Sequence, residues 1–306
     1  MDWVKVPLVH LFAFILQTVL IPFTMTRSVL ISGVSTGIGY HLLQAYYRRG
    51  YKVFGSIRRE SDRERLLSEF PDFVPLLFDV TDESAIREGI EVVRRHLDGK
   101  GLDLLINNAG VAVSAPLMLI DTEDFHHQFD VNLYGVLRLT KACLPLLGAV
   151  ENADHPPGRI LNISSISGQV AYPYLGPYVS SKHALEGLSN SWRRELYPFG
   201  IDVIIIAPGS IRTPIWKKNS SSGVPDRFRN SIFGKYLENF RTITLNTGKR
   251  GMDPDEFANK VVAISEKKRP KTRYAIVKNY FSDWILVRYL VPARVLDWGI
   301  HRQLKK

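Results

Sequence analysis

The chain has 306 residues, of which 45% are hydrophobic and 23% are charged. These proportions are typical of a globular protein with a full core, and they exclude a disordered chain. The single cysteine, Cys143, excludes an intrachain disulfide and a thiolate metal cluster, and its place in a predicted helix indicates a small buried apolar residue. The formal charge of +10 permits a nucleic acid, an anionic membrane or a phosphorylated cofactor as partner.

The first segment of the chain is apolar. Residues 6–23 form an apolar run that His10 and Gln17 interrupt, and this run is just long enough to cross a bilayer. A cleaved signal peptide is the alternative, but the small-residue cleavage pattern is missing and the first predicted strand follows directly after Arg27. We therefore expect residues 1–26 to form an uncleaved membrane anchor. Positive charge is denser after this segment than before it, which places the rest of the chain on the cytosolic side.

Beyond Arg27, strand-like and helix-like segments alternate. The predicted strands cover residues 28–32, 51–57, 73–78, 102–106, 159–163, 201–206 and 272–277. The predicted helices cover residues 37–49, 61–69, 82–97, 122–147, 177–198 and 254–267. This alternation is typical of an α/β protein with a doubly wound parallel sheet of about seven strands, a Rossmann fold.

The first predicted turn between a strand and a helix is rich in glycine. Gly33, Gly37 and Gly39 allow a tight turn, so backbone amides can approach a pyrophosphate at the start of the helix. Such turns also occur without a ligand. The end of the second strand indicates which dinucleotide would bind. Arg58 and Arg59 stand there, at the place where an acid would bind the ribose hydroxyls of NAD(H). Guanidinium groups pair with a 2′-phosphate, so the sequence favours NADP(H).

Tyr178 and Lys182 are four residues apart in a predicted helix, with Ser165 thirteen residues upstream. The spacing puts both side chains on one face, where the ammonium can stabilise the phenolate. An isolated phenol is a poor base at neutral pH. We therefore expect Lys182 to lower the pKa of Tyr178 and make it a usable proton donor and acceptor for hydride-transfer chemistry.

Taken in order, these motifs resemble those of the short-chain dehydrogenase/reductase family over residues 27–277, with Ser32 where the family has threonine. The sequence after Tyr178 is similar to the branch of membrane-associated retinol and hydroxysteroid dehydrogenases. The resemblance implies catalytic roles for Asn132, Ser165, Tyr178 and Lys182 and no metal. It also implies cofactor binding by Gly33, Ser35, Thr36, Gly37, Ile38, Gly39, Arg58, Arg59, Asp79, Val80, Asn107, Ala109, Gly110, Tyr178, Lys182, Pro208, Gly209, Ile211 and Thr213.

The activity implied by this resemblance is NADP(H)-dependent interconversion of an alcohol with its ketone or aldehyde. Tyr178 would exchange the proton, Lys182 would lower its pKa and hold the nicotinamide ribose, and Ser165 would orient the reacting oxygen. Asn132 would hold a water beside Lys182. A different class of function is a membrane-tethered NADPH-binding sensor or scaffold without turnover, against which the intact set of four residues argues.

Two further segments break the alternation. Residues 210–250 contain an insertion that would form a lid over the substrate, within a catalytic domain of residues 27–278. Residues 279–306 form a predicted amphipathic tail, broken at Pro292, in which basic and aromatic residues mix. This mixture suits a lipid interface, although a solvated basic surface is the alternative, and no motif supports nucleic-acid binding. We expect a lipophilic substrate such as a steroid or retinoid, attachment to the endoplasmic reticulum or to lipid droplets, and a possible homodimer.

Overall fold

The computed structural model describes residues 27–214 and 223–305. The predicted anchor, residues 1–26, lies outside these ranges, and so does the part of the predicted lid from 215 to 222. Within the described ranges, no helix combines the length and the apolar character that crossing a membrane requires.

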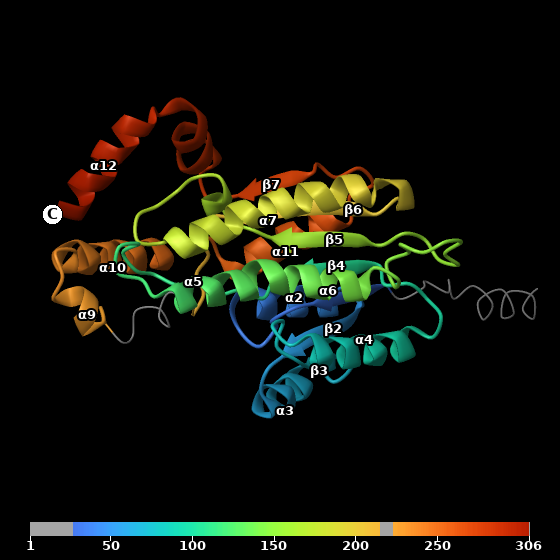
Figure 1. Cartoon of the computed structure of the whole chain (residues 1–306). Coiled ribbons are helices and arrows are strands. Elements are labelled where there is room, and N and C mark those ends of the chain that lie inside the picture. The colour runs from blue at the N-terminus through green and yellow to red at the C-terminus, as the bar shows by residue number, and fades with distance from the viewer. Residues whose placement is uncertain (1–26, 215–222, 306) are drawn as a thin grey trace, which may run out of the picture.

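A single sheet of seven parallel strands forms the centre of the molecule, in the order β3-β2-β1-β4-β5-β6-β7 (Figure 1). The predicted parallel Rossmann sheet is confirmed, and every strand begins and ends within two residues of its predicted position. The strand order reverses between β1 and β4, and in such sheets ligands bind outside the carboxyl ends of the strands at this point. The strands are β1 (Ser28–Ile31), β2 (Lys52–Ile57), β3 (Val74–Leu77), β4 (Leu104–Asn107), β5 (Arg159–Ile163), β6 (Asp202–Pro208) and β7 (Arg273–Ile276).

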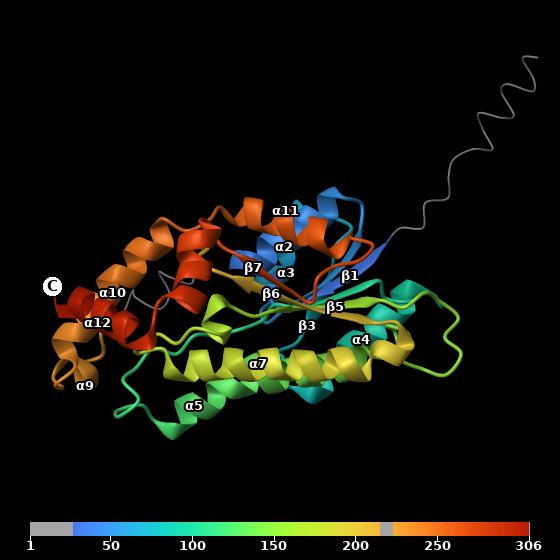
Figure 2. The ribbon, with the colours of Figure 1, turned by 90° about the horizontal axis from the view of Figure 1, so that it is seen from above.

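Helices cover both faces of the sheet because strand side chains alternate between its two sides. In β1, Val29 and Ile31 pack in one core cluster with α2 and α11, whereas Leu30 packs in the other with α4 and α6. Figure 2 shows α2, α3 and α11 on one side and α4, α5 and α7 on the other. The covering helices are α2 (Gly37–Arg48), α3 (Glu60–Glu69), α4 (Glu83–Leu97), α7 (Gly176–Glu195) and α11 (Pro254–Ser265).

The helix predicted over residues 122–147 is interrupted. It divides into α5 (Thr122–Phe129), a π-helical turn η1 (Asp130–Tyr134) and α6 (Gly135–Cys143). Asn132 lies on this turn and is buried, with its amide bonded to the backbone of Val111 and to the hydroxyl of Ser181. Single π-helical turns of this kind are frequent at functional sites.

Further helices gather at one end of the sheet. Two of them, α9 (Asp226–Arg229) and α10 (Gly234–Lys249), form within the predicted lid, and the C-terminal segment forms η4 (Phe281–Leu290) and α12 (Ala293–Lys305). Pro292 separates η4 from α12, as expected from a residue that has no backbone donor. Both views show α10 beside α12 (Figures 1 and 2), and Asn239 donates from Nδ2 to the carbonyl of Leu304 at 2.8 Å.

The glycines of two helices give a test of this packing. A Cβ at Gly39 would lie 2.0 Å from the carbonyl oxygen of Gly33 and 2.6 Å from Nδ2 of Asn108, so Gly39→Ala must displace the first turn. We expect it to lower the free energy of unfolding by about 2 kcal/mol. A Cβ at Gly187 on α7 meets nothing within 4 Å, so Gly187→Ala is the matched control and should gain about 0.5–1 kcal/mol. Denaturant titration measures both, and equal values would contradict the packing described.

Candidate active site

A cavity of about 870 Å³ lies at the carboxyl ends of the strands. Its walls come from the segments after β4, β5 and β6 and from the start of α7. Helices α10 and α12 close the outer side, and their contributions include Phe240, Thr244, Leu245, Ile300 and Leu304. The cavity therefore has a polar floor on the sheet and a largely apolar cover.

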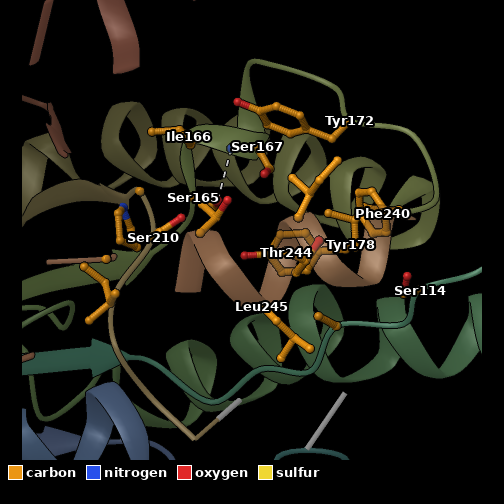
Figure 3. Close-up of a pocket in the computed structure, with 18 of the residues that line it drawn as sticks. Ser114, Ser165, Ile166, Ser167, Tyr172, Tyr178, Ser210, Phe240, Thr244 and Leu245 are labelled. Atoms are coloured by element: carbon orange, nitrogen blue, oxygen red, sulfur yellow. Dashed lines mark hydrogen bonds between the residues drawn. The ribbon is translucent and has the colours of Figure 1, made fainter. Parts of the chain in front are cut away.

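Ser165 and Tyr178 meet inside this cavity (Figure 3). Ser165 follows β5, and its Oγ accepts a hydrogen bond from the backbone N–H of Ser167 at 3.0 Å. The nearby hydroxyl of Ser165 lowers the pKa of Tyr178, so it favours the ionised phenol. Lys182 lies one turn onward on α7, with Nζ 5.8 Å from the centre of the Tyr178 ring. The two groups therefore share one face of the helix, as the spacing predicted.

The expected lowering of the Tyr178 pKa does not occur in this geometry. Burial raises the pKa of Tyr178, and the Ser165 hydroxyl only partly opposes this effect. Burial also lowers the pKa of Lys182 from 10.5 to about 8, while the charge of Glu186 acts in the opposite direction. Nζ of Lys182 donates to the carbonyl of Ile163 at 2.8 Å. The lysine therefore keeps its charge at neutral pH but loses it readily above about pH 8.

Asn132 approaches the same helix from η1. Its Nδ2 donates to Oγ of Ser181 at 3.1 Å, and Ser181 in turn donates to the carbonyl of Tyr178 at 2.8 Å. Its Oδ1 accepts from the N–H of Val111 at 2.9 Å, which fixes the strand-to-helix segment after β4. Asn132 is therefore joined to the neighbour of Lys182, although none of its hydrogen bonds involves Lys182 itself.

The glycine-rich turn lies between β1 and α2, beside the cavity. Gly33 and Gly37 adopt positive φ angles of 72° and 63°, which glycine tolerates without strain. Gly39 has no room for a side chain, as shown above. The backbone at the start of α2 is therefore open to a ligand, and a helix N-terminus attracts phosphate.

Two side chains, Ser32 in this turn and Asn108 after β4, join the turn to the segment after β4. Oγ of Ser32 accepts from the N–H groups of Asn108 and Ala109 at 2.9 and 3.0 Å, so the serine performs this task without a threonine methyl group. Nδ2 of Asn108 donates to the carbonyls of Ser32 and Gly33. Asn108 also lines the cavity, and the sequence prediction overlooked it in favour of its neighbour Asn107. Asn107 is buried between strands and helices, bonded to Thr140 and Asn162.

Arginines surround the outer end of the turn. Arg58 follows β2, has 65% of its side chain exposed, and pairs with Asp79 at 3.3 Å between Nη1 and Oδ2. Hydrogen bonds from Thr81 and Arg58 lower the pKa of Asp79 against the opposing effect of burial, so this carboxylate stays ionised. Arg59 is also exposed. Nη2 of Arg65, which the sequence prediction missed, donates to the carbonyl of Ser35 within the turn at 2.7 Å.

The segment after β6 forms another wall of the cavity. A Cβ at Gly37 would lie 3.7 Å from the side chain of Thr213, so this segment meets the glycine-rich turn. Of the predicted residues, several line the cavity: Ile38, Gly110, Ser165, Tyr178, Lys182, Pro208, Gly209, Ile211 and Thr213. The others do not line the cavity: Gly33, Ser35, Thr36, Gly37, Gly39, Arg58, Arg59, Asp79, Val80, Asn107, Ala109 and Asn132.

This arrangement fits a dinucleotide. Open backbone at a helix start suits the pyrophosphate, and exposed guanidinium groups at the end of β2 suit an added phosphate. In the part of the chain that the structure describes, no group of His, Cys, Asp and Glu side chains could hold a metal ion.

Several known proteins are similar to this chain in sequence or in fold. The family model described as short chain dehydrogenase matches residues 27–223. The NADPH-dependent 3-dehydrocapnine reductase of Ornithobacterium rhinotracheale is 35% identical over 281 residues, which cover 92% of this chain and 98% of that protein. A short-chain dehydrogenase from Streptomyces avermitilis has a similar fold, with a TM-score of 0.71, 23% identity, and coverage of 92% of this chain and 98% of that chain. The structure of ElxO with NADP bound has a TM-score of 0.67 and 26% identity, and the match covers 84% of this chain and 100% of that chain. The chain belongs to the short-chain dehydrogenase/reductase family.

Proposed function

We propose that this enzyme interconverts an alcohol and its ketone or aldehyde with NADP(H), using Ser165, Tyr178, Lys182 and Asn132. The observation that carries the proposal is the meeting of Ser165, Tyr178 and Lys182 inside one cavity at the carboxyl ends of the strands, with Nζ of Lys182 5.8 Å from the centre of the Tyr178 ring. A carbonyl oxygen that accepts from both hydroxyls would be oriented and polarised by two donors at once.

The chain's own groups divide the work as follows. In reduction, Tyr178 donates its proton to the carbonyl oxygen; in oxidation, it accepts the proton of the alcohol. Lys182, while charged, stabilises the phenolate that remains, and Ser165 holds the reacting oxygen. Asn132 fixes the start of this helix through Ser181. When bound, the nicotinamide supplies or accepts the hydride.

An alternative function is an NADPH-binding sensor or scaffold without turnover. Such a protein would need the glycine-rich turn and the arginines, but it would have no use for a tyrosine, a serine and a lysine gathered in the cavity. We therefore favour catalysis.

Substitution of the tyrosine separates these two functions. Tyr178→Phe removes one oxygen and the transferable proton, so we expect turnover to fall by about 100- to 10,000-fold while NADPH binding, followed by cofactor fluorescence, stays unchanged. Tyr197→Phe is the control, because this tyrosine is 82% exposed and lies outside the cavity. Wild-type turnover in Tyr178→Phe would refute the assignment.

The cofactor is NADP(H), because two exposed cations follow β2 at the place where the adenosine ribose would lie. The name of the reductase from Ornithobacterium rhinotracheale, which specifies NADPH, supports this choice. Asp79 is already paired with Arg58, so its negative charge is partly balanced before a phosphate binds.

Removal of the two cations tests the preference. We expect the double variant Arg58→Ala/Arg59→Ala to bind NADPH about 10- to 100-fold more weakly, since charge-assisted hydrogen bonds to phosphate are lost, and to bind NADH as before. Arg63→Ala on α3 is the matched control, because Arg63 pairs only with Glu60 on its own helix among the contacts described. Equal weakening for both cofactors would contradict a phosphate contact.

The substrate is lipophilic, and we propose a steroid, a retinoid or another lipid. The apolar cover from α10 and α12 and a volume of about 870 Å³ suit such a molecule. We also propose that residues 279–306 contact a membrane next to the catalytic domain of residues 27–278. Tyr289, Leu290 and Trp298 are exposed there, and Arg288 and Arg302 lie over the rings of Tyr289 and Trp298. With residues 1–26 as anchor, this attachment would favour the endoplasmic reticulum or lipid droplets.

Ketones of increasing chain length, dispersed in neutral or anionic vesicles, test both proposals together. We expect kcat/KM to rise with chain length until the cavity is full, and to be higher on anionic vesicles because the segment is basic. Leu245→Asn should raise KM for the longest ketones about tenfold, whereas Ile232→Asn, at a side chain 78% exposed, should not. Rates that depend on neither chain length nor vesicle charge would contradict the proposals.

A further inference from the structure

Glu186 is a buried carboxylate one turn beyond Lys182 on α7, with 8% of its side chain exposed. A charge in such a place requires partners. Arg273 of β7 supplies them: its Nε donates to both carboxylate oxygens at 3.0 and 3.2 Å, and its Nη2 donates to Oε1 at 2.9 Å. Neither residue lines the cavity, and the function proposed above uses neither of them.

The carboxylate of Glu186 also binds the loop that carries Ser165, through one residue before Ser165 and one residue after it. Oγ of Ser164 donates to Oε1 of Glu186 at 3.2 Å, and Nε2 of Gln169 donates to Oε2 at 2.8 Å. The loop passes so close that a Cβ at Gly168 would lie 2.7 Å from Oε1. The position of Ser165 therefore depends on a group behind the cavity wall.

The C-terminal segment fixes this cluster from outside. The guanidinium of Arg273 lies 4.6 Å from the ring centre of Trp284, which is 3% exposed. Nε of Arg288 donates to Oε1 of Gln169 at 3.3 Å. Segment η4 thus contacts two of the three partners of Glu186, Arg273 and Gln169, and its residue Val287 also lines the cavity.

Glu186 also acts on the charge of Lys182. Burial lowers the pKa of Lys182 to about 8, and the nearby negative charge of Glu186 raises it. Among the described residues, the titratable groups beside Lys182 on its own helix are Tyr178 and Glu186, and Arg273 from β7 reaches this cluster through Glu186. From β5, Lys182 meets the uncharged carbonyl of Ile163.

We propose that Glu186 is a positioning residue of the active site: it holds the loop of Ser165, keeps Lys182 charged, and is itself held by Arg273 and the C-terminal segment. The proposal rests on the function proposed above, because it requires that a charged Lys182 supports proton transfer by Tyr178.

The pH profile of carbonyl reduction tests it. In the wild-type enzyme kcat/KM should fall as the pH rises through about 8, where Lys182 loses its proton. Glu186→Gln removes the charge that raises the pKa of Lys182, so the fall should begin about one pH unit lower. Glu186→Asp keeps the charge but shortens the side chain, so its kcat should fall while the profile stays in place. Glu195→Gln, at an exposed carboxylate on the same helix, should behave as wild type.

Two outcomes would overturn the proposal: an unmoved profile in Glu186→Gln, or a loss by the same factor at every pH, which would indicate a merely structural role. Circular dichroism and the unfolding temperature show whether each variant folds. If Glu186→Gln does not fold, Arg273→Gln and Arg273→Lys replace it. Arg273→Gln leaves the carboxylate of Glu186 without its cation, so the fall of kcat/KM should move to higher pH. Arg273→Lys keeps a cation and should leave the fall in place. Identical profiles in the two variants would overturn the proposal.

Failure of this inference is distinguishable from failure of the proposed function. Wild-type turnover in Tyr178→Phe would mean that the proposed chemistry is wrong. An inactive Tyr178→Phe together with an unmoved profile in Glu186→Gln would mean that only the role of Glu186 is wrong.

Discussion

The account depends on a lysine that is buried and yet charged. Nζ of Lys182 lies 5.8 Å from the centre of the Tyr178 ring, in a place where burial lowers the pKa of the lysine to about 8 despite the opposing charge of Glu186. A neutral lysine there could not stabilise a phenolate, and Tyr178, whose pKa burial raises, would then be a poor partner for proton exchange. Proton exchange therefore depends on the positive charge of Lys182. The carboxylate of Glu186, one turn further along the helix, favours this charge because it raises the pKa of the lysine.

The sheet provides the setting for this interaction. All seven strands are parallel, so the segments after β1, β4, β5 and β6 converge at one edge. Two contacts join these segments: Ser32 bonds to Asn108, and Gly37 lies beside Thr213. Within the segment after β5, Glu186 of α7 binds the loop that carries Ser165. The glycine-rich turn and α7 are far apart in the chain but border one cavity. Distances at the reacting groups therefore depend on a packed core, not on a mobile loop.

The strands and the shared helix face of Tyr178 and Lys182 could be predicted because their signals are local. Strands such as 159–163 and 201–206 are continuous apolar runs bounded by polar residues, and the spacing of Tyr178 to Lys182 fixes a shared helix face. Other features depend on tertiary contacts. The π-helical turn at Asn132, the support from Asn108 and Arg65, and the ion pair of Glu186 with Arg273 join residues that are distant in sequence. The effect of burial on the pKa of Tyr178 requires coordinates for the same reason, and the expectation from spacing alone had the wrong sign.

The most direct test is a single-turnover experiment with excess enzyme, a limiting amount of NADPH and a long-chain ketone, followed across the pH range around the pKa of Lys182. The account predicts that each NADPH consumed yields one alcohol, and that the rate of this step declines as the pH rises through about 8. Bound NADPH that persists unchanged beside a panel of lipophilic ketones at every pH would contradict it.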